Sequence, residues 1–69
     1  MEIIKLREDY IKLGQALKAA GLVQSGVEAK DAMEDGRVSV NGEAAFQRGQ
    51  KLVDGDIVTY DGQTIKITK

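Results

Sequence analysis

The sequence contains no cysteine, no histidine, no proline and no tryptophan. Without cysteine there is no disulfide framework and no thiolate metal site, and without histidine the most common general base and metal ligand is missing. Carboxylates could still hold magnesium or calcium, but no loop of regularly spaced acidic ligands is present. We therefore expect no metal site and no cofactor.

Long apolar runs are absent as well. Within residues 1–9, charged side chains interrupt the apolar ones before the core of a signal peptide or a membrane span could form. The chain has 69 residues, and a domain of this size buries only about 60% of its unfolded surface, which leaves no room for a deep catalytic pocket. We expect a single soluble domain over residues 1–69, cytoplasmic and monomeric, that neither binds membranes nor acts as an enzyme.

Charge of one sign does not dominate the chain. Ten basic and eleven acidic residues give a net charge of −1, which argues against a cationic protein that coats nucleic acids. The distribution is uneven, because residues 10–27 contain two lysines and no acid, whereas residues 28–35 contain four acids and one lysine. The folded chain could present one basic and one acidic face. Equally, such charges could simply keep the surface soluble.

The middle of the chain carries the clearest structural signals. Ser25, followed three residues later by Glu28, is typical of a capping box at the start of a helix. Gly36 can adopt the left-handed conformation that ends a helix, and the Asn-Gly pair at residues 41–42 strongly favours a hairpin turn. These signals predict a helix over residues 26–35 that leads into a tight β-hairpin.

The rest of the chain predicts one more helix and several strands. A strand is expected at residues 2–6 and a helix at about residues 10–20, where apolar residues recur at spacings of three and four. Apolar and polar residues alternate over residues 37–40, as in a half-buried strand. Two β-rich runs, residues 57–60 and 64–68, are joined by Asp-Gly and predict a hairpin. The fold class is therefore α+β, with two helices packed on a small, mostly antiparallel sheet.

Both helices and the aromatic residues supply the expected core. The predicted buried side chains are Tyr10, Leu13, Leu17 and Ala20 of the first helix, Ala29, Ala32 and Met33 of the second, and also Phe46 and Tyr60. Residues 43–50 are the least regular part of the sequence, and we expect a short strand or a loop there.

Five linked elements of the sequence resemble those of the S4 domain, a small RNA-binding module first recognised in a ribosomal small-subunit protein. They are Leu13, Gly21, the Ser-x-x-Glu-Ala-basic segment 25–30, the Gly-x-Val-x-Val-Asn-Gly segment 36–42, and the Gly-Asp-Ile-Val segment 55–58. The motif core covers about residues 12–58, with an added strand at each end. The chain therefore also resembles small stand-alone bacterial proteins that consist of an S4-like domain alone.

The resemblance implies an S4-like fold with its alpha-L motif, and RNA binding without catalysis. In larger members of the family, such as pseudouridine synthases and tyrosyl-tRNA synthetases, another domain performs the catalysis. The chain departs from the family at Ala19 and Gly26, where many S4 domains carry RNA-facing arginines. The resemblance thus implies a reduced basic surface, with weaker or more selective RNA binding.

Six basic residues are the candidates for RNA contact: Lys12, Lys18, Lys30, Arg37, Arg48 and Lys51. Most of them also have a structural explanation, which for Arg48 and Lys51 is only that charged loops are common. Lys30 can pair with Glu34, a contact worth only about 0.2–0.5 kcal/mol, and Lys18 can interact with the helix dipole. Arg37 can satisfy the last carbonyls of its helix. Gly14, which costs about 1 kcal/mol inside a helix, suggests close approach of another element or of RNA backbone.

The leading hypothesis is a non-catalytic module that binds structured RNA through a basic face on the two helices and the turn after them. The resemblance suggests ribosomal RNA, its precursor or tRNA as the ligand, and the ribosome or its assembly particles as wider partners. The alternative is a protein–protein interaction module that keeps this frame and docks through the acidic residues of segment 28–35 or an exposed sheet edge.

Overall fold

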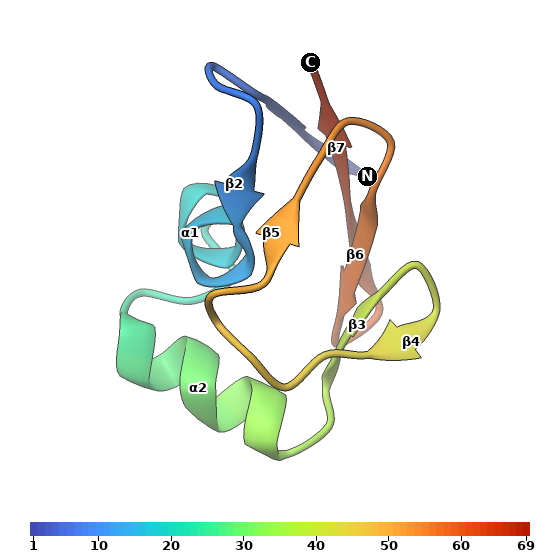
Figure 1. Cartoon of the computed structure of the whole chain (residues 1–69). Helices are drawn as coiled ribbons and strands as arrows, with labels where there is room; N and C mark the ends of the chain where they lie inside the picture. Colours follow the sequence, from blue (N-terminus) through green and yellow to red (C-terminus); the bar gives the residue numbers. More distant parts are fainter.

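The computed structural model describes residues 1–69 and contains two helices and seven strands (Figure 1). The helices are α1 (Leu13–Ala19) and α2 (Gly26–Glu34). The strands are β1 (Glu2–Lys5), β2 (Ile11–Lys12), β3 (Val38–Val40), β4 (Glu43–Ala44), β5 (Lys51–Leu52), β6 (Ile57–Tyr60) and β7 (Gln63–Thr68). The predicted α+β class is confirmed.

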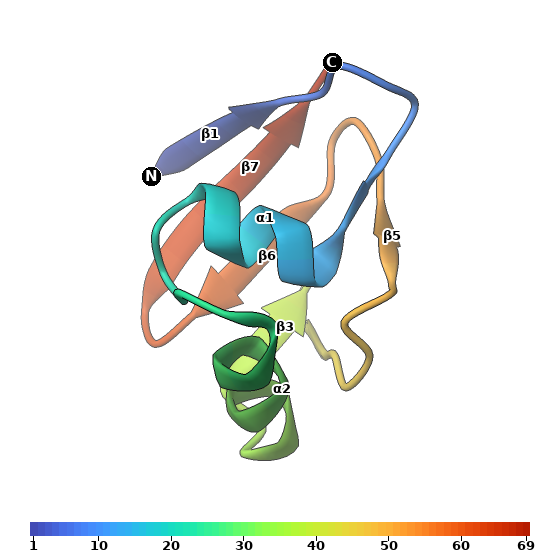
Figure 2. The same ribbon diagram turned by 90° about the vertical axis from the view of Figure 1, so that its left-hand side faces the viewer.

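Five strands form the main sheet in the order β1-β7-β6-β3-β4, and β2 pairs with β5 in a separate two-stranded sheet. All pairings are antiparallel except that between β1 and β7, which joins the two ends of the chain in parallel. Figure 2 shows α1 lying across the face of β6 and β7, with α2 below it. The mostly antiparallel sheet expected from the sequence is therefore present, with the first strand added at its edge.

One hydrophobic core joins the two helices to one face of the sheet. It contains Leu13, Ala16 and Leu17 of α1, Ala29, Ala32 and Met33 of α2, and the alternate inward residues of β3, β6 and β7. The burial of Ala29, Ala32 and Met33 confirms the predicted inward face of α2. The outer face of the sheet is uncovered. Its neighbouring residues Ile3, Lys66 and Ile57, which lie side by side by strand register, are all exposed.

The Ser25 cap of α2 is present as the sequence predicts, but the second bond of the expected capping box goes to the residue before the cap. The Ser25 hydroxyl oxygen accepts a hydrogen bond from the Glu28 amide at 3.2 Å, and the Glu28 carboxylate accepts one from the Gln24 amide at 3.2 Å. At the other end, Gly36 has a φ of +74°. The amide of Gly36 bonds to the carbonyl of Met33, and the amide of Arg37 bonds to that of Ala32. This pair of bonds is a Schellman motif, which requires the left-handed glycine.

Two predicted hairpin turns are confirmed by their backbone geometry. Asn41 and Gly42 have φ values of 53° and 87°, and Asp61 and Gly62 have φ values of 48° and 80°. Both central residues of a type I′ turn need positive φ, which Asn, Asp and Gly tolerate best. The first turn joins β3 to β4 and the second joins β6 to β7, while β6 pairs with β3 along its other edge.

The first helix begins later than predicted. Residues 10–12 do not form its first turn, because Ile11 and Lys12 pair as β2 with Leu52 and Lys51 of β5. The first amides of α1 are then satisfied by backbone carbonyls of the segment before β5: Leu13 donates to Gln50 at 2.8 Å and Gly14 to Arg48 at 3.0 Å. A strand pairing with a partner about forty residues away overrides the local helical pattern.

Two of the three predicted buried aromatics are wrong. Tyr60 is buried, but Tyr10 is 39% exposed and Phe46 is 64% exposed. Tyr10 precedes β2 instead of occupying the buried face of a helix, and Phe46 lies in the irregular segment after β4. Full burial of a Phe side chain would stabilise the fold by about 1.5–3 kcal/mol, so this small core forgoes a sizeable contribution.

We predict that Gly36→Ala lowers the free energy of unfolding by about 1–2 kcal/mol, because alanine at a φ of +74° is strained. The matched control is Gly49→Ala, since a Cβ at Gly49 meets no atom within 4 Å and its φ is not left-handed. The control should change stability by less than about 0.5 kcal/mol. Urea denaturation measures both values, and equal stabilities of the two variants would contradict the Schellman interpretation.

Candidate functional site

Three basic side chains line one shallow hollow of about 490 Å³, here called the basic hollow. They are Lys12 at the end of β2, Lys18 of α1 and Arg48 of the segment between β4 and β5. The other lining residues are Gln15 and three glycines, so the hollow contains no acidic and no apolar side chain. The glycines leave backbone exposed where a ligand could approach closely.

Lys18 and Lys12 reach the hollow from neighbouring elements. Gln15 and Lys18 are three residues apart on one side of α1, away from the buried Leu13 and Leu17, and Lys12 is the extended residue just before the helix. Both lysines are exposed, as the sequence predicts, although Lys12 lies outside the helix. Lys18 also lies in the last turn of α1, so its interaction with the helix dipole remains compatible with a role in binding.

Arg48 is positioned by contacts with both helices. Its carbonyl accepts the Gly14 amide, and an added Cβ at Gly14 would lie 3.4 Å from the Arg48 Cβ. Its guanidinium extends to α2, where Nη1 would lie 2.7 Å from a Cβ at Gly26. The element that approaches Gly14 closely, as the sequence suggested, is therefore the segment that contains Arg48. The guanidinium also supplies a positive charge beside Gly26, one of the two positions where the resemblance implied a missing arginine.

Lys51 lies next to this group. It stands opposite Lys12 in the register of β2 and β5, and its ammonium nitrogen is 4.7 Å from the centroid of the Tyr10 ring. That distance is typical of a cation–π contact, which holds Lys51 near the basic hollow without a carboxylate. Two like charges opposite each other repel, so this pair favours an anionic ligand.

A second hollow of about 550 Å³ adjoins the first and shares Lys12 and Gln15 with it. Lys5 and Arg7 line this second hollow, together with Glu8 and Tyr10. The sequence pattern does not indicate Lys5 or Arg7 as site residues, because residues 2–9 match a strand and the start of a helix. No local signal reveals them, since only the fold brings the segment after β1 beside α1.

Lys30 lies near this surface but has an acidic neighbour. It is one helical turn after Gly26, on the side of α2 that meets Arg48. Its ammonium nitrogen is 4.0 Å from the Glu34 carboxylate, and both side chains are exposed. The structural alternative foreseen for Lys30 is thus present, and such an exposed pair contributes little stability.

Arg37 is the one candidate that the structure separates from the others. Its guanidinium lies 3.5 Å from the Asp35 carboxylate, 3.3 Å from that of Asp61, and 5.5 Å from the centroid of the Tyr60 ring. It lines neither hollow. The Schellman bonds of the backbone, and not the Arg37 side chain, satisfy the carbonyls of Ala32 and Met33.

The cations of the basic hollow have no acidic partners. The ion pairs of the structure involve Lys30, Arg37 and Lys69, whereas Lys12, Lys18, Arg48 and Lys51 form none. An incoming anion would therefore not have to displace a carboxylate.

No group of three or more acidic side chains lies together in a way that could hold a metal ion. None of the helices is long and apolar enough to span a membrane.

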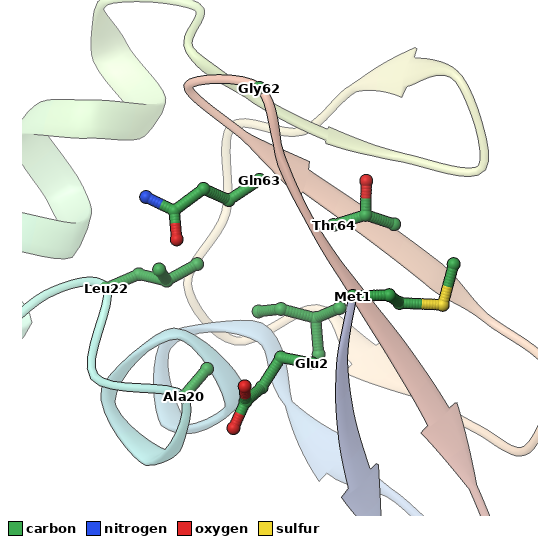
Figure 3. Close-up of a pocket in the computed structure, with 8 residues that line it drawn as sticks. Met1, Glu2, Ala20, Leu22, Gly62, Gln63 and Thr64 are labelled. Atoms are coloured by element: carbon green, nitrogen blue, oxygen red, sulfur yellow. The ribbon is translucent and has the colours of Figure 1, made fainter.

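A third hollow, of about 410 Å³, has a different character (Figure 3). It lies between the start of β1, the end of α1 and the turn before β7, where Glu2, Leu22 and Gln63 face it. Glu2 is its only charged side chain. Because it has a carboxylate and no basic side chain, this hollow suits a polyanion less well than the basic hollow does.

Comparison with known proteins identifies a family and similar bacterial proteins. The family model of the S4 domain matches residues 4–68. A Bacillus subtilis (strain 168) protein named "Probable ribosome maturation protein RlbA" is 42% identical over 59 residues, which cover 86% of this chain and 83% of that protein. An Escherichia coli (strain K12) protein, YbcJ, described as a candidate RNA-binding protein, is 30% identical over 61 residues, with 88% and 87% covered. None of these names describes an enzyme.

We predict that Gly26→Ala displaces the Arg48 guanidinium without unfolding the protein, because the new methyl group would lie 2.7 Å from Nη1, the flexible end of that side chain. Alanine favours helix by up to about 1 kcal/mol over glycine, so the free energy of unfolding should stay equal or rise. NMR should show the Arg48 Nε–H signal shifting in this variant. An unmoved signal, or a loss of stability, would contradict the placement of Arg48 over Gly26.

Proposed function

The chain belongs to the S4 domain family, and from this membership and its basic hollow we propose that it is a non-catalytic module that binds structured RNA. The observation that carries the proposal is that Lys12, Lys18 and Arg48 line one hollow together with three glycines. None of these three cations has an acidic partner. Phosphate oxygens would meet these cations and the exposed backbone together.

The proposed interface extends beyond the basic hollow. Lys51, together with Lys5 and Arg7 of the second hollow, adds positive charge along the side of α1, where Glu8 and apolar side chains share that hollow. A net charge of −1 does not oppose this, because screening in physiological salt limits interactions between exposed charges to about 8 Å, and the local cations dominate. Lys30 would add to the contact from α2, whereas Arg37 would contribute only if the RNA reached the turn before β7.

Structured RNA is the class of ligand that suits this surface. Double-stranded RNA is recognised mainly by shape and backbone contacts, and the cations here occupy a rigid helix and an anchored loop. Ribosomal RNA or its precursor is the RNA that the name of the Bacillus subtilis relative supports, with tRNA as the other family ligand. Ribosome-assembly particles in the cytoplasm would then be the place of action.

The protein-interaction alternative has less support from the structure. One of its two candidate surfaces, the acidic segment 28–35, is partly neutralised, since Glu34 pairs with Lys30 and Asp35 with Arg37. The other is an exposed edge of the sheet. A pull-down with and without ribonuclease distinguishes the two functions. Partners lost after nuclease treatment favour RNA binding, and partners retained favour protein docking.

We predict that Lys18→Glu weakens binding to structured RNA and reduces the dependence of affinity on salt. Each lost phosphate contact should lower the slope of log affinity against log salt by about 0.7–0.9. The matched control is Lys66→Glu, which makes the same charge change on the uncovered outer face of the sheet. Fluorescence anisotropy at several salt concentrations measures both, and equal effects of the two variants would refute an interface on α1.

A further inference from the structure

Phe46 is the only phenylalanine of the chain, and it is not used in the core. Its side chain is 64% exposed, and it is not among the hydrophobic residues packed against the core. Single exposed apolar residues are common on proteins, so exposure alone assigns no role. The position of Phe46 relative to the basic hollow is what distinguishes it.

The backbone on both sides of Phe46 is anchored. The preceding residue, Ala45, is buried and donates a hydrogen bond to the Val38 carbonyl at 3.0 Å. Two residues later, the Arg48 carbonyl accepts the Gly14 amide at 3.0 Å. The phenyl ring is therefore presented from a fixed segment, which limits the conformational entropy that a ligand would have to remove.

Phe46 is also close in the chain to Arg48 of the proposed interface. Two residues of chain separate its Cα from that of Arg48 by at most about 7 Å. Arg48 lines the basic hollow with Lys12 and Lys18. An occupant of this surface that satisfies both features needs anionic groups for the cations and a flat apolar group for the ring. A nucleotide has both.

Tyr10, the other exposed aromatic residue near the basic hollow, already has a cation over its ring. Lys51 lies 4.7 Å from the centroid of the Tyr10 ring, and no cation lies over the ring of Phe46. Phe46 has no hydroxyl, so it can stack on a base without selecting it by hydrogen bonds. Aromatic stacking of this kind is tolerant of base identity.

We propose that Phe46 is a stacking platform for an unpaired base of the RNA whose phosphates contact the basic hollow. The inference rests on the proposed function and narrows its ligand. The base must be unpaired, because bases inside an A-form helix are stacked on one another and their faces are inaccessible. The bound RNA would therefore carry a bulge, a loop or a strand end beside the helix that α1 contacts.

The test compares two RNA duplexes of equal length, one fully paired and one with a single bulged nucleotide. Wild type should bind the bulged RNA more tightly. Phe46→Ala should lower the affinity for the bulged RNA by about 5- to 150-fold, the range that corresponds to loss of one stacked base, and leave the affinity for the paired RNA unchanged. Phe46→Leu should behave like Phe46→Ala, because it keeps an apolar side chain but has no aromatic face.

Two further variants make the test specific. Ile3→Ala removes an apolar side chain of nearly equal exposure, 63%, from the far face of the sheet, and should not affect either RNA. Phe46→Trp should retain the preference for the bulge. Because the chain has no other tryptophan, its fluorescence should be quenched by the bulged RNA and much less by the paired one.

The outcomes separate this inference from the function on which it rests. If wild type binds neither RNA, both the proposed function and the stacking role are overturned. If wild type binds RNA but Phe46→Ala binds the bulged duplex equally well, only the stacking role is overturned. Equal weakening toward both RNAs would also overturn it, since a stacked bulge cannot account for lost binding to a paired helix.

Discussion

The docking of residues 48–52 on the start of α1 is the contact on which the rest of the site depends. The first amides of a helix have no partner within the helix, and here the carbonyls of Gln50 and Arg48 accept those of Leu13 and Gly14 at 2.8 and 3.0 Å. The same contact aligns β2 with β5. It thereby brings Lys51 opposite Lys12 and extends the Arg48 side chain toward Gly26.

This arrangement lets a nearly neutral protein present a local positive surface. The acids of α2 and of the turn before β7 form ion pairs with Lys30 and Arg37, whereas the cations around α1 have none. The structure contains no buried polar or charged side chain, so no desolvated charge has to be compensated within the fold. In the proposed function, binding would therefore depend on which exposed charges are left unpaired, and not on total charge.

The sequence predicted the parts of the fold whose causes are local. The cap at Ser25, the left-handed Gly36 and the two type I′ turns depend on residues within a few positions of one another, and all were confirmed. The interpretation of residues 10–12 as helix was wrong, because pairing with β5 lies outside any local window. Phe46 was wrongly assigned to the core for a related reason. Its hydrophobicity does not reveal that the loop containing it is held, by contacts with distant segments, with the side chain exposed to solvent.

The same distinction separates the site residues. The sequence by itself determined that Lys18 lies off the buried side of α1, because helical periodicity fixes that relation. The exposed position of Lys12 follows instead from its place at the end of β2. Only the tertiary structure decided that Arg48 joins them, that Lys5 and Arg7 adjoin them, and that Arg37 is held by Asp35 and Asp61 instead. Those relations connect distant segments, and they arise where backbone hydrogen bonds and core packing bring those segments together.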